Sequence, residues 1–283
     1  VHGGGPTAVI NASLYGVIEE AKRNPEVGKV YGAIGGTGAI FSETFIDLTS
    51  FDDEKLKLLL HTPASAIGSS RYPLYEKDYE KMVDIFKKHD IKYVLLNGGN
   101  GTMDACGHIY EVCKDQDIKV VGIPKTIDND IAMTDHSPGY GSAARFIAAS
   151  TQKVGEDVKS LPIHVCIMEA MGRNAGWITA ASALARRKQG DAPHLIYLPE
   201  RNFNEDEFLE DVSRLQKKQG GVVVLVSEGL HDANGESIVP PIFKSERAVY
   251  YGDVSSHLAN LVVKKLGVKK MPTSSILWLR NLA

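Results

Sequence analysis

Short apolar runs alternate along this chain with longer stretches in which apolar residues recur every three or four positions. The short runs predict strands, which cover residues 30–33, 93–97, 119–123, 164–169, 194–198 and 222–226. The longer stretches predict helices, which cover residues 6–22, 77–88, 103–113, 142–158, 175–187, 205–218 and 252–266. Strands that alternate with helices form right-handed βαβ units, so we expect an α/β protein with mainly parallel sheets flanked by helices.

The length of the chain predicts two lobes. The chain has 283 residues, and about 150 residues is a typical domain size. The turn-forming stretch 138–141 is the expected boundary, which divides the chain into residues 1–140 and 141–283. Residues 1–5 have the pattern of a strand end followed by a glycine turn, so a further strand is expected before Val1.

Charge and cysteine content narrow the function classes. The 32 basic and 35 acidic residues leave a net charge of −3, which supplies no general field for binding nucleic acid or an anionic membrane. No apolar run approaches the roughly 20 residues of a membrane span. The three cysteines form no CxxC pair, so they are expected to be free buried thiols in a reducing compartment. A cytoplasmic location is therefore predicted.

Two glycine-rich turns follow strands of the predicted sheets. In such sheets ligands bind beyond the carboxyl ends of the strands. Residues 3–7 (GGGPT) and 98–102 (GGNGT) each lead into a predicted helix. The N–H groups and the dipole at a helix N-terminus favour phosphate oxygens, so both turns are candidate phosphate sites. Neither turn matches the dinucleotide-binding or P-loop pattern, and a plain tight turn is the alternative for each.

The stretch 124–130 (PKTIDND) carries the most informative polar residues. Asp128 and Asp130 come shortly after a predicted strand, and carboxylates are poor core material. One of them is a candidate for removing a proton from a substrate hydroxyl, and the other for binding Mg²⁺. Lys125 would offset the charge of a phosphate. The alternative is a turn in which an aspartate caps a helix.

Three further polar residues are candidates for binding substrate. Arg173 follows a predicted strand and is suited to a phosphate, although an ordinary surface ion pair is the alternative. Glu228 also follows a strand, where it can accept hydrogen bonds from a polyol. Arg71, in the stretch 68–72, would reach a second phosphate.

These motifs appear in the order found in the 6-phosphofructokinase family, which the chain resembles over nearly its whole length. The matching parts are residues 4–11, 68–71, 98–102, 124–130, 171–173 and Glu228. Residues 3–11, 171–177 and 195–200 are most similar to the longer, pyrophosphate-type branch. The resemblance implies a Mg²⁺-dependent phosphotransferase of glycolysis. Its reaction would transfer a phosphoryl group to the 1-hydroxyl of fructose 6-phosphate, giving fructose 1,6-bisphosphate.

The resemblance also implies roles for individual residues. The catalytic set would comprise the base Asp128 together with Thr126, Lys125 and Asp130. The second lobe would hold the sugar phosphate through Met171, Gly172, Arg173, Glu228 and Arg280. The first lobe would hold the phosphoryl donor through Gly4, Arg71, Asn100, Gly101 and Thr102. Mg²⁺ would lie near Asn100 and Asp130. A homodimer or homotetramer is the assembly that the resemblance implies.

The predicted donor is ATP, with pyrophosphate as the alternative. In the family, glycine after the Asn100 position leaves room for a nucleotide and aspartate there accompanies pyrophosphate, so Gly101 favours ATP. Lys125, in contrast, is typical of pyrophosphate enzymes. Asn100 stands where many members have a metal-binding aspartate, and an amide is the weaker Mg²⁺ ligand.

Departures at the end of the chain leave another alternative open. Met271 stands where the family has an arginine from a neighbouring subunit, and the helices that usually follow are missing. Together with Asn100, these departures are also compatible with a non-catalytic subunit that binds a sugar phosphate. A lipid or NAD kinase would share only the turn at residues 98–102.

Overall fold

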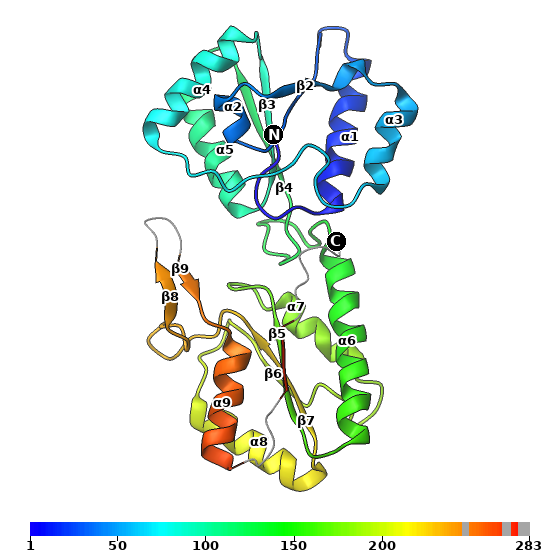
Figure 1. The fold of residues 1–283 in the computed structure, drawn as a ribbon, viewed down its shortest axis with the longest axis vertical. Helices are drawn as coiled ribbons and strands as arrows, with labels where there is room; N and C mark the ends of the chain where they lie inside the picture. Colours follow the sequence, from blue (N-terminus) through cyan, green and yellow to red (C-terminus); the bar gives the residue numbers. More distant parts are fainter. Residues whose placement is uncertain (245–248, 268–272, 277–283) are drawn as a thin grey trace. The chain divides into compact units, whose positions relative to one another are not determined.

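The computed structural model describes residues 1–244, 249–267 and 273–276, and the chain divides into two compact units (Figure 1). The first unit contains Val1–Thr126 and the second contains Ile127–Leu279. This division lies upstream of residues 138–141, where the sequence predicts it. The side chain of Asn129 holds the intervening loop together, because its Oδ1 accepts from the Ser137 amide at 2.7 Å and its Nδ2 donates to the Asp135 carbonyl at 3.2 Å. The assignment of donor and sugar phosphate to separate lobes stays a prediction.

A parallel strand pair carries the second glycine turn in the first unit. Strands β3 (Tyr93–Gly98) and β4 (Lys119–Pro124) pair in register over six residues. The first residues of the chain lie beside β3, because the Asn97 amide donates to the Val1 carbonyl and the Gly3 amide to the Asn97 carbonyl, both at 2.9 Å. The other elements are α1 (Ala8–Arg23), β1 (Tyr31–Ala33), α2 (Gly38–Phe41), β2 (Phe45–Asp47), α3 (Asp53–Lys57), α4 (Glu76–Lys88) and α5 (Asn100–Cys113).

Helices α4 and α5 bury their apolar faces against β3. Met82 and Phe86 of α4 and Ile109 of α5 lie in one buried cluster with Leu96 of β3. Burial of a side chain of this size contributes roughly 1.5–3 kcal/mol. The cluster therefore fixes the end of β3 and the start of α5, between which the glycine turn lies.

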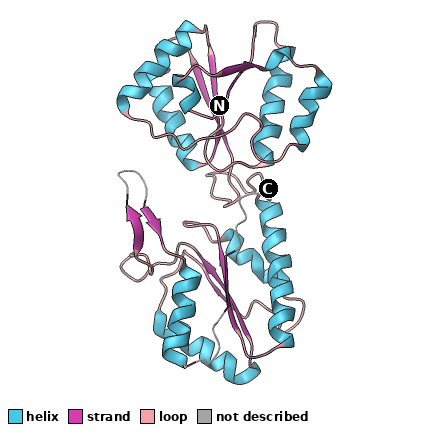
Figure 2. Ribbon diagram, in the orientation of Figure 1, coloured by secondary structure: helices cyan, strands magenta, loops and turns pink. Residues whose placement is uncertain are grey.

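The second unit contains a four-stranded parallel sheet in the order β10–β5–β7–β6. Its strands are β5 (Val165–Ala170), β6 (Leu195–Tyr197), β7 (Val222–Ser227) and β10 (Thr273–Ile276). The helices are α6 (Tyr140–Ser160), α7 (Trp177–Ala181), α8 (Glu205–Gln219) and α9 (Val254–Leu266). Figure 2 shows these helices on both sides of the strands. An antiparallel hairpin, β8 (Pro241–Lys244) and β9 (Val249–Tyr251), completes this unit in the described residues.

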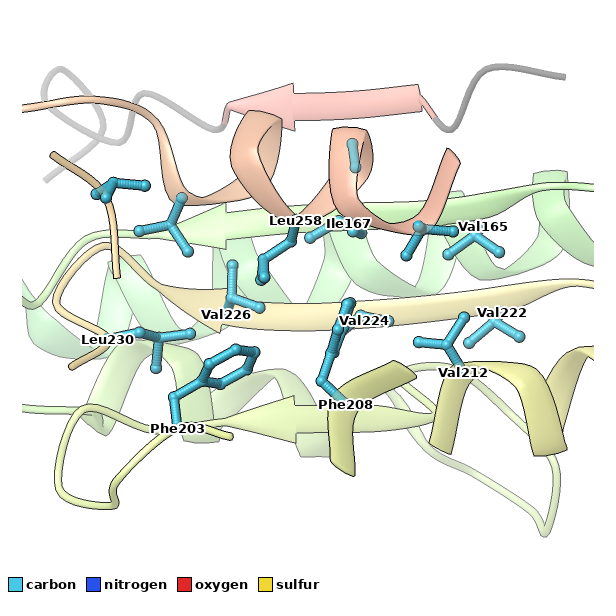
Figure 3. Packing of buried hydrophobic residues seen from close by; sticks show 14 residues of the cluster. Val165, Ile167, Phe203, Phe208, Val212, Val222, Val224, Val226, Leu230 and Leu258 are labelled. Atoms are coloured by element: carbon cyan, nitrogen blue, oxygen red, sulfur yellow. The ribbon is translucent and has the colours of Figure 1, made fainter. Parts of the chain in front are cut away.

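The core of the second unit explains the continuous apolar sequence of β7. All six residues of β7 are buried. Val224 lies in one cluster with Phe208 of α8 and Leu258 of α9 (Figure 3). Helices α6 and α7 contact the same strand, so the alternate side chains Val223 and Leu225 are buried as well. A strand covered on both faces needs apolar residues at every position.

The predicted α/β class with parallel sheets flanked by helices is confirmed. One helix is shorter than predicted, because residues 175–187 form only α7 and a 3₁₀ turn at Ser182–Ala185. The chain is extended at Arg186, whose Nε donates to the Pro193 carbonyl at 2.6 Å. Cys106, Cys113 and Cys166 are free and buried, as expected. In the described parts of the chain, none of the helices has both the length and the apolar character of a membrane span.

Candidate active site

The two glycine turns of the first unit pack directly against each other. A Cβ atom on Gly98 would lie 2.4 Å from the Gly3 carbonyl oxygen and 2.4 Å from Thr102 Oγ1. A Cβ atom on Gly3 would also lie 2.4 Å from Thr102 Oγ1. Thr102 is buried, and Gly4 has a φ of 73°, which favours glycine. Glycine is therefore required here for close packing, and the two candidate phosphate turns form one structure.

The start of α5 places a helix N-terminus at this structure. Its N-cap residue is Gly99, which has no side chain to cap the helix. The amides of Thr102 and Met103 donate to the Gly99 carbonyl, at 2.9 and 3.0 Å. A Cβ atom on Gly101 would meet no atom of the described chain within 4 Å. A helix start of this kind, with open space at its first turn, suits an anionic ligand.

Lys125 brings a positive charge to the same turns. Its side chain is buried, and its Nζ donates to the Gly5 carbonyl at 2.6 Å. Its amide donates to the Gly98 carbonyl at 2.9 Å, which ties the end of β4 to the second turn. Burial above all, with a contribution from Lys125, lowers the pKa of His2 to about 3, so the neighbouring imidazole is neutral.

Arg71 reaches these turns through its neighbours in the chain. The Gly4 amide donates to the Ser70 carbonyl at 3.1 Å, and Ser69 Oγ donates to the Gly4 carbonyl at 2.7 Å. Arg71 itself is exposed. The structure thus brings together five first-unit residues that the sequence predicts for the site: Gly4, Arg71, Gly101, Thr102 and Lys125. Asn100 is the first residue of α5 and is exposed.

The aspartates of residues 124–130 lie in the second unit, at its first residues. Ile127 and Asn129 are buried and anchor the loop, and Asn129 has a φ of 59°. Asp128 and Asp130 are half-buried, and Oδ1 of each is inaccessible to solvent. The next helix, α6, has Gly139 as its N-cap, so the alternative in which one of these aspartates caps a helix is wrong. Thr126 is half-buried and is the last residue of the first unit before the division.

Parallel pairing of β5 with β7 brings the predicted sugar-phosphate residues together in the second unit. Ala170 and Ser227 are opposite each other at the ends of the two strands. The Gly172 amide then donates to Glu228 Oε1 at 3.3 Å, and Ser227 Oγ donates to the Gly172 carbonyl at 2.8 Å. Gly172 has a φ of 109°, a conformation that favours glycine.

Arg173 lies on the surface of this loop. Its guanidinium carbon is 5.5 Å from the ring centroid of Tyr251 in β9. Within the described residues it takes part in no ion pair, so the surface ion-pair alternative is not supported there. A Cβ atom on Gly229 would lie 1.8 Å from the Arg173 carbonyl oxygen, so the backbone of the loop rests on Gly229. Met171 is half-buried beside them, whereas Arg280 and Met271 lie outside the described residues.

Comparison with known proteins identifies the family. Residues 1–275 match the phosphofructokinase family. The chain belongs to that family. The predicted resemblance, and with it membership of a family of phosphotransferases, is confirmed.

The most similar relatives come from the pyrophosphate-type branch. A pyrophosphate–fructose 6-phosphate 1-phosphotransferase of Rhodospirillum rubrum is 41% identical over 99% of this chain and 71% of the relative. The enzyme of that name from Halomonas elongata is 38% identical over 94% of this chain and 66% of the relative. The crystal structure of a pyrophosphate-dependent phosphofructokinase from Marinobacter aquaeolei superposes with a TM-score of 0.81 at 36% identity, covering all of this chain and 68% of that one. The chain thus spans about two thirds of the length of these phosphofructokinases.

The residues predicted to hold Mg²⁺ have oxygen-bearing side chains of the kind that bind this ion. The described residues contain no group of three or more histidines, cysteines or acidic residues that would enclose a metal ion. Mg²⁺ is usually bound through one or two carboxylates together with substrate phosphates, so a closed protein cage is not required. Asp130, with one oxygen buried, offers a carboxylate of this kind, and the assignment of Asp130 and Asn100 to Mg²⁺ stays a prediction.

Two acidic residues that the sequence did not single out bind backbone amides. Glu200 Oε1 accepts from the Gly176 amide at 2.6 Å, and Glu169 Oε2 accepts from the Ser255 amide at 2.8 Å. Burial is the main cause that raises the pKa of Glu169. Glu200 follows β6, so the rule that selects polar residues after strands would have found it. Glu169 lies within β5, where no sequence signal separates it from its apolar neighbours.

Proposed function

We propose that the chain transfers a phosphoryl group from pyrophosphate to the 1-hydroxyl of fructose 6-phosphate, giving fructose 1,6-bisphosphate and phosphate. The observation that supports this most is the activity of its relatives, which are 41% and 38% identical over nearly the whole chain. The polar residues gathered at the strand ends of each unit agree with it. Phosphoryl transfer depends on positioning and charge neutralisation, which glycine turns, a lysine, an arginine and carboxylates provide.

Pyrophosphate is a better-supported donor than ATP. The ATP prediction depends on Gly101, whose position leaves open space beside α5. Open space at that position accommodates a nucleotide, but it accommodates pyrophosphate equally well. Lys125, which is typical of pyrophosphate enzymes, lies against the glycine turn with its Nζ 2.6 Å from the Gly5 carbonyl. The relatives and Lys125 therefore weigh more than the room at Gly101.

Asp128 would act as the base in this reaction. It would take the proton of the 1-hydroxyl as that oxygen attacks the terminal phosphorus of pyrophosphate, and the bond to the bridging oxygen would break to release phosphate. Thr126 and Asp130 flank it in the chain. When bound by Asp130 and Asn100, Mg²⁺ would neutralise part of the phosphate charge. The half-buried position of Asp128 suits it to the role of the base, because a base shielded from bulk water keeps its orientation.

The substrate phosphates would be held by different units. Gly4, Arg71, Gly101, Thr102 and Lys125 of the first unit would hold pyrophosphate. Met171, Gly172 and Arg173 would hold the sugar phosphate together with Glu228 and Arg280, the latter outside the described residues. Arg173 has its guanidinium exposed, as a ligand-binding residue requires. A homodimer or homotetramer and a cytoplasmic location stay predictions.

The test is a coupled assay of the purified full-length protein with fructose 6-phosphate and either donor. We expect turnover with pyrophosphate and, in Asp128→Asn, a loss of at least about 100-fold, because a general base contributes that much. Asp135→Asn is the matched control, since Asp135 is exposed on the same loop and only its backbone carbonyl is used. Unfolding curves of both variants check the fold.

Other outcomes would contradict separate parts of the proposal. Turnover with ATP alone would overturn the donor. Near-normal turnover of Asp128→Asn would overturn the role of the base. Absence of turnover with both donors would favour the non-catalytic subunit instead.

A further inference from the structure

Glu200 makes a close contact with the end of the loop that carries Arg173. Its Oε1 accepts from the Gly176 amide at 2.6 Å. A Cβ atom on Gly176 would lie 2.6 Å from Glu200 Oε2, so both carboxylate oxygens are near this backbone. Gly176 is buried and directly precedes α7. A hydrogen bond from an amide to an ionised carboxylate is short and about twice as strong as a neutral one.

The other end of the same loop is held by Ser227, the last residue of β7, and by Glu228, which follows it. The Gly172 amide donates to Glu228 at 3.3 Å, and Ser227 Oγ donates to the Gly172 carbonyl at 2.8 Å. Between the two ends the loop is compact, because a Cβ atom on Gly172 would lie 2.3 Å from the Ala175 carbonyl oxygen. Arg173 therefore projects from a backbone that is fixed on both sides.

We propose that Glu200 is a positioning residue, which holds the loop from Gly172 to Gly176 so that Arg173 is oriented for the sugar phosphate. This inference rests on the proposed function, in which Arg173 binds fructose 6-phosphate. Glu200 acts through its acceptor oxygen, which is bound to the Gly176 amide, and the charge of the carboxylate strengthens this hydrogen bond. Without the acceptor, the loop end and the start of α7 gain freedom, and binding must then restrict them again.

Loss of Glu200 is expected to change the KM for fructose 6-phosphate and not the KM for pyrophosphate. The proposed pyrophosphate residues belong to the first unit, whereas Glu200 and its partners belong to the second. Loss of Glu200 should therefore weaken binding of the sugar phosphate and leave binding of pyrophosphate as it is. A general loss of structure would instead lower kcat or disturb both substrates.

The experiment compares Glu200→Ala and Glu200→Gln with the wild-type full-length protein. For Glu200→Ala we expect the KM for fructose 6-phosphate to rise about three- to tenfold, the effect of one charge-assisted hydrogen bond at an exposed carboxylate. The KM for pyrophosphate and kcat should both stay within about twofold of the wild-type values. Glu200→Gln retains a neutral acceptor oxygen and should raise the KM for fructose 6-phosphate less than Glu200→Ala does. Glu210→Ala is the matched control, because Glu210 is an exposed residue of α8 in the same unit.

Fluorescence provides a readout independent of turnover. Trp177 adjoins Gly176 and is 53% exposed, so quenching by iodide should increase in Glu200→Ala if the loop end becomes mobile. The measurement uses a Trp278→Phe background, which leaves Trp177 as the single tryptophan of these 283 residues. If Glu200→Ala fails to fold, Glu200→Asp replaces it, because its shorter side chain withdraws the oxygen from the Gly176 amide.

Each contrary result has its own meaning. An unchanged KM for fructose 6-phosphate in Glu200→Ala, with an active wild type, would overturn the positioning role. A defect in Glu200→Gln as large as in Glu200→Ala would overturn the acceptor explanation. An inactive wild type would instead contradict the proposed function, and unchanged Trp177 quenching in Glu200→Ala would then overturn the positioning role on its own.

Discussion

The two units place a glycine-rich loop after a parallel strand, but they hold it by different means. In the first unit, Gly98 is fixed by close packing against the Gly3 carbonyl and Thr102. In the second unit, the loop is fixed by carboxylates, with Glu228 on the Gly172 amide and Glu200 on the Gly176 amide. The same sequence signal therefore leads to two loops that are stabilised in different ways.

This difference indicates how each loop would bind phosphate. At the first turn of α5, packing fixes the backbone and the N-cap Gly99 has no side chain, so the positive end of the helix is suited to an anion. In the second unit two loop amides already donate to carboxylates, so an anion there must depend on a side chain, for which Arg173 is placed. Glycine after a strand thus indicates a tight turn, and the neighbouring acidic residues decide what the turn can bind.

The largest effect is expected from Gly98→Ala, which tests packing in the first unit. The new methyl group would meet the Gly3 carbonyl and the buried Thr102, and overpacking of this kind lowers the free energy of unfolding by about 2–3 kcal/mol. Urea unfolding measures this change. Gly101→Ala is the control, because a Cβ atom there meets open space and alanine is a better helix former by up to about 1 kcal/mol. Equal stability of Gly98→Ala and wild type would contradict the packing comparison.

Gly229→Ala should have its main effect on substrate binding by the second unit. A Cβ atom would lie 1.8 Å from the Arg173 carbonyl oxygen, and the half-exposed loop would have to move away. The KM for fructose 6-phosphate is expected to rise about tenfold, which corresponds to roughly 1.4 kcal/mol of lost binding. Steady-state kinetics with pyrophosphate in excess measures it. Gly252→Ala, whose Cβ would make ordinary contacts at 3.9 Å, should behave as wild type; an equal defect in both variants would refute the contact-based explanation.

Tyr251→Ala should have the smallest effect of the three. The Arg173 guanidinium lies over the Tyr251 ring, and an exposed cation–π contact contributes about 0.5–1 kcal/mol. The expected rise in the KM for fructose 6-phosphate is therefore about two- to fivefold. Tyr251→Phe keeps the ring and should retain the wild-type KM. If Tyr251→Phe and Tyr251→Ala were equally impaired, the hydroxyl and not the ring would be the relevant group.

The order of strands and helices could be predicted because apolar periodicity is a local property. The α/β class with parallel sheets followed from that order, whereas the pairing of Ala170 with Ser227, and with it the meeting of Gly172 and Glu228, comes from the structure. Periodicity is uninformative for short elements such as β8 and β9, which the sequence analysis did not find. Their apolar residues Ile242 and Phe243 are exposed, so no buried face imposes a pattern on the sequence.

The contacts that position the site could not be predicted because they join distant residues. Glu200 and Gly176 are separated by other secondary structure, and only the fold decides which oxygen meets which amide. The contacts of Asn129 with Asp135 and Ser137, which hold the loop after Ile127 together, were likewise not predicted. The donor prediction depended on Gly101, where an open space does not distinguish a nucleotide from a smaller anion.

The burial of Cys166 inside the sheet of the second unit has a consequence for sulfur chemistry. Burial raises the pKa of this thiol to about 11, so at pH 8 about one molecule in a thousand carries the reactive thiolate. Peroxides and alkylating reagents would find almost no nucleophile in the folded protein. Modification of Cys166 would instead record how often its strand separates from its neighbours, and the rate of that reaction would report on spontaneous opening of the core.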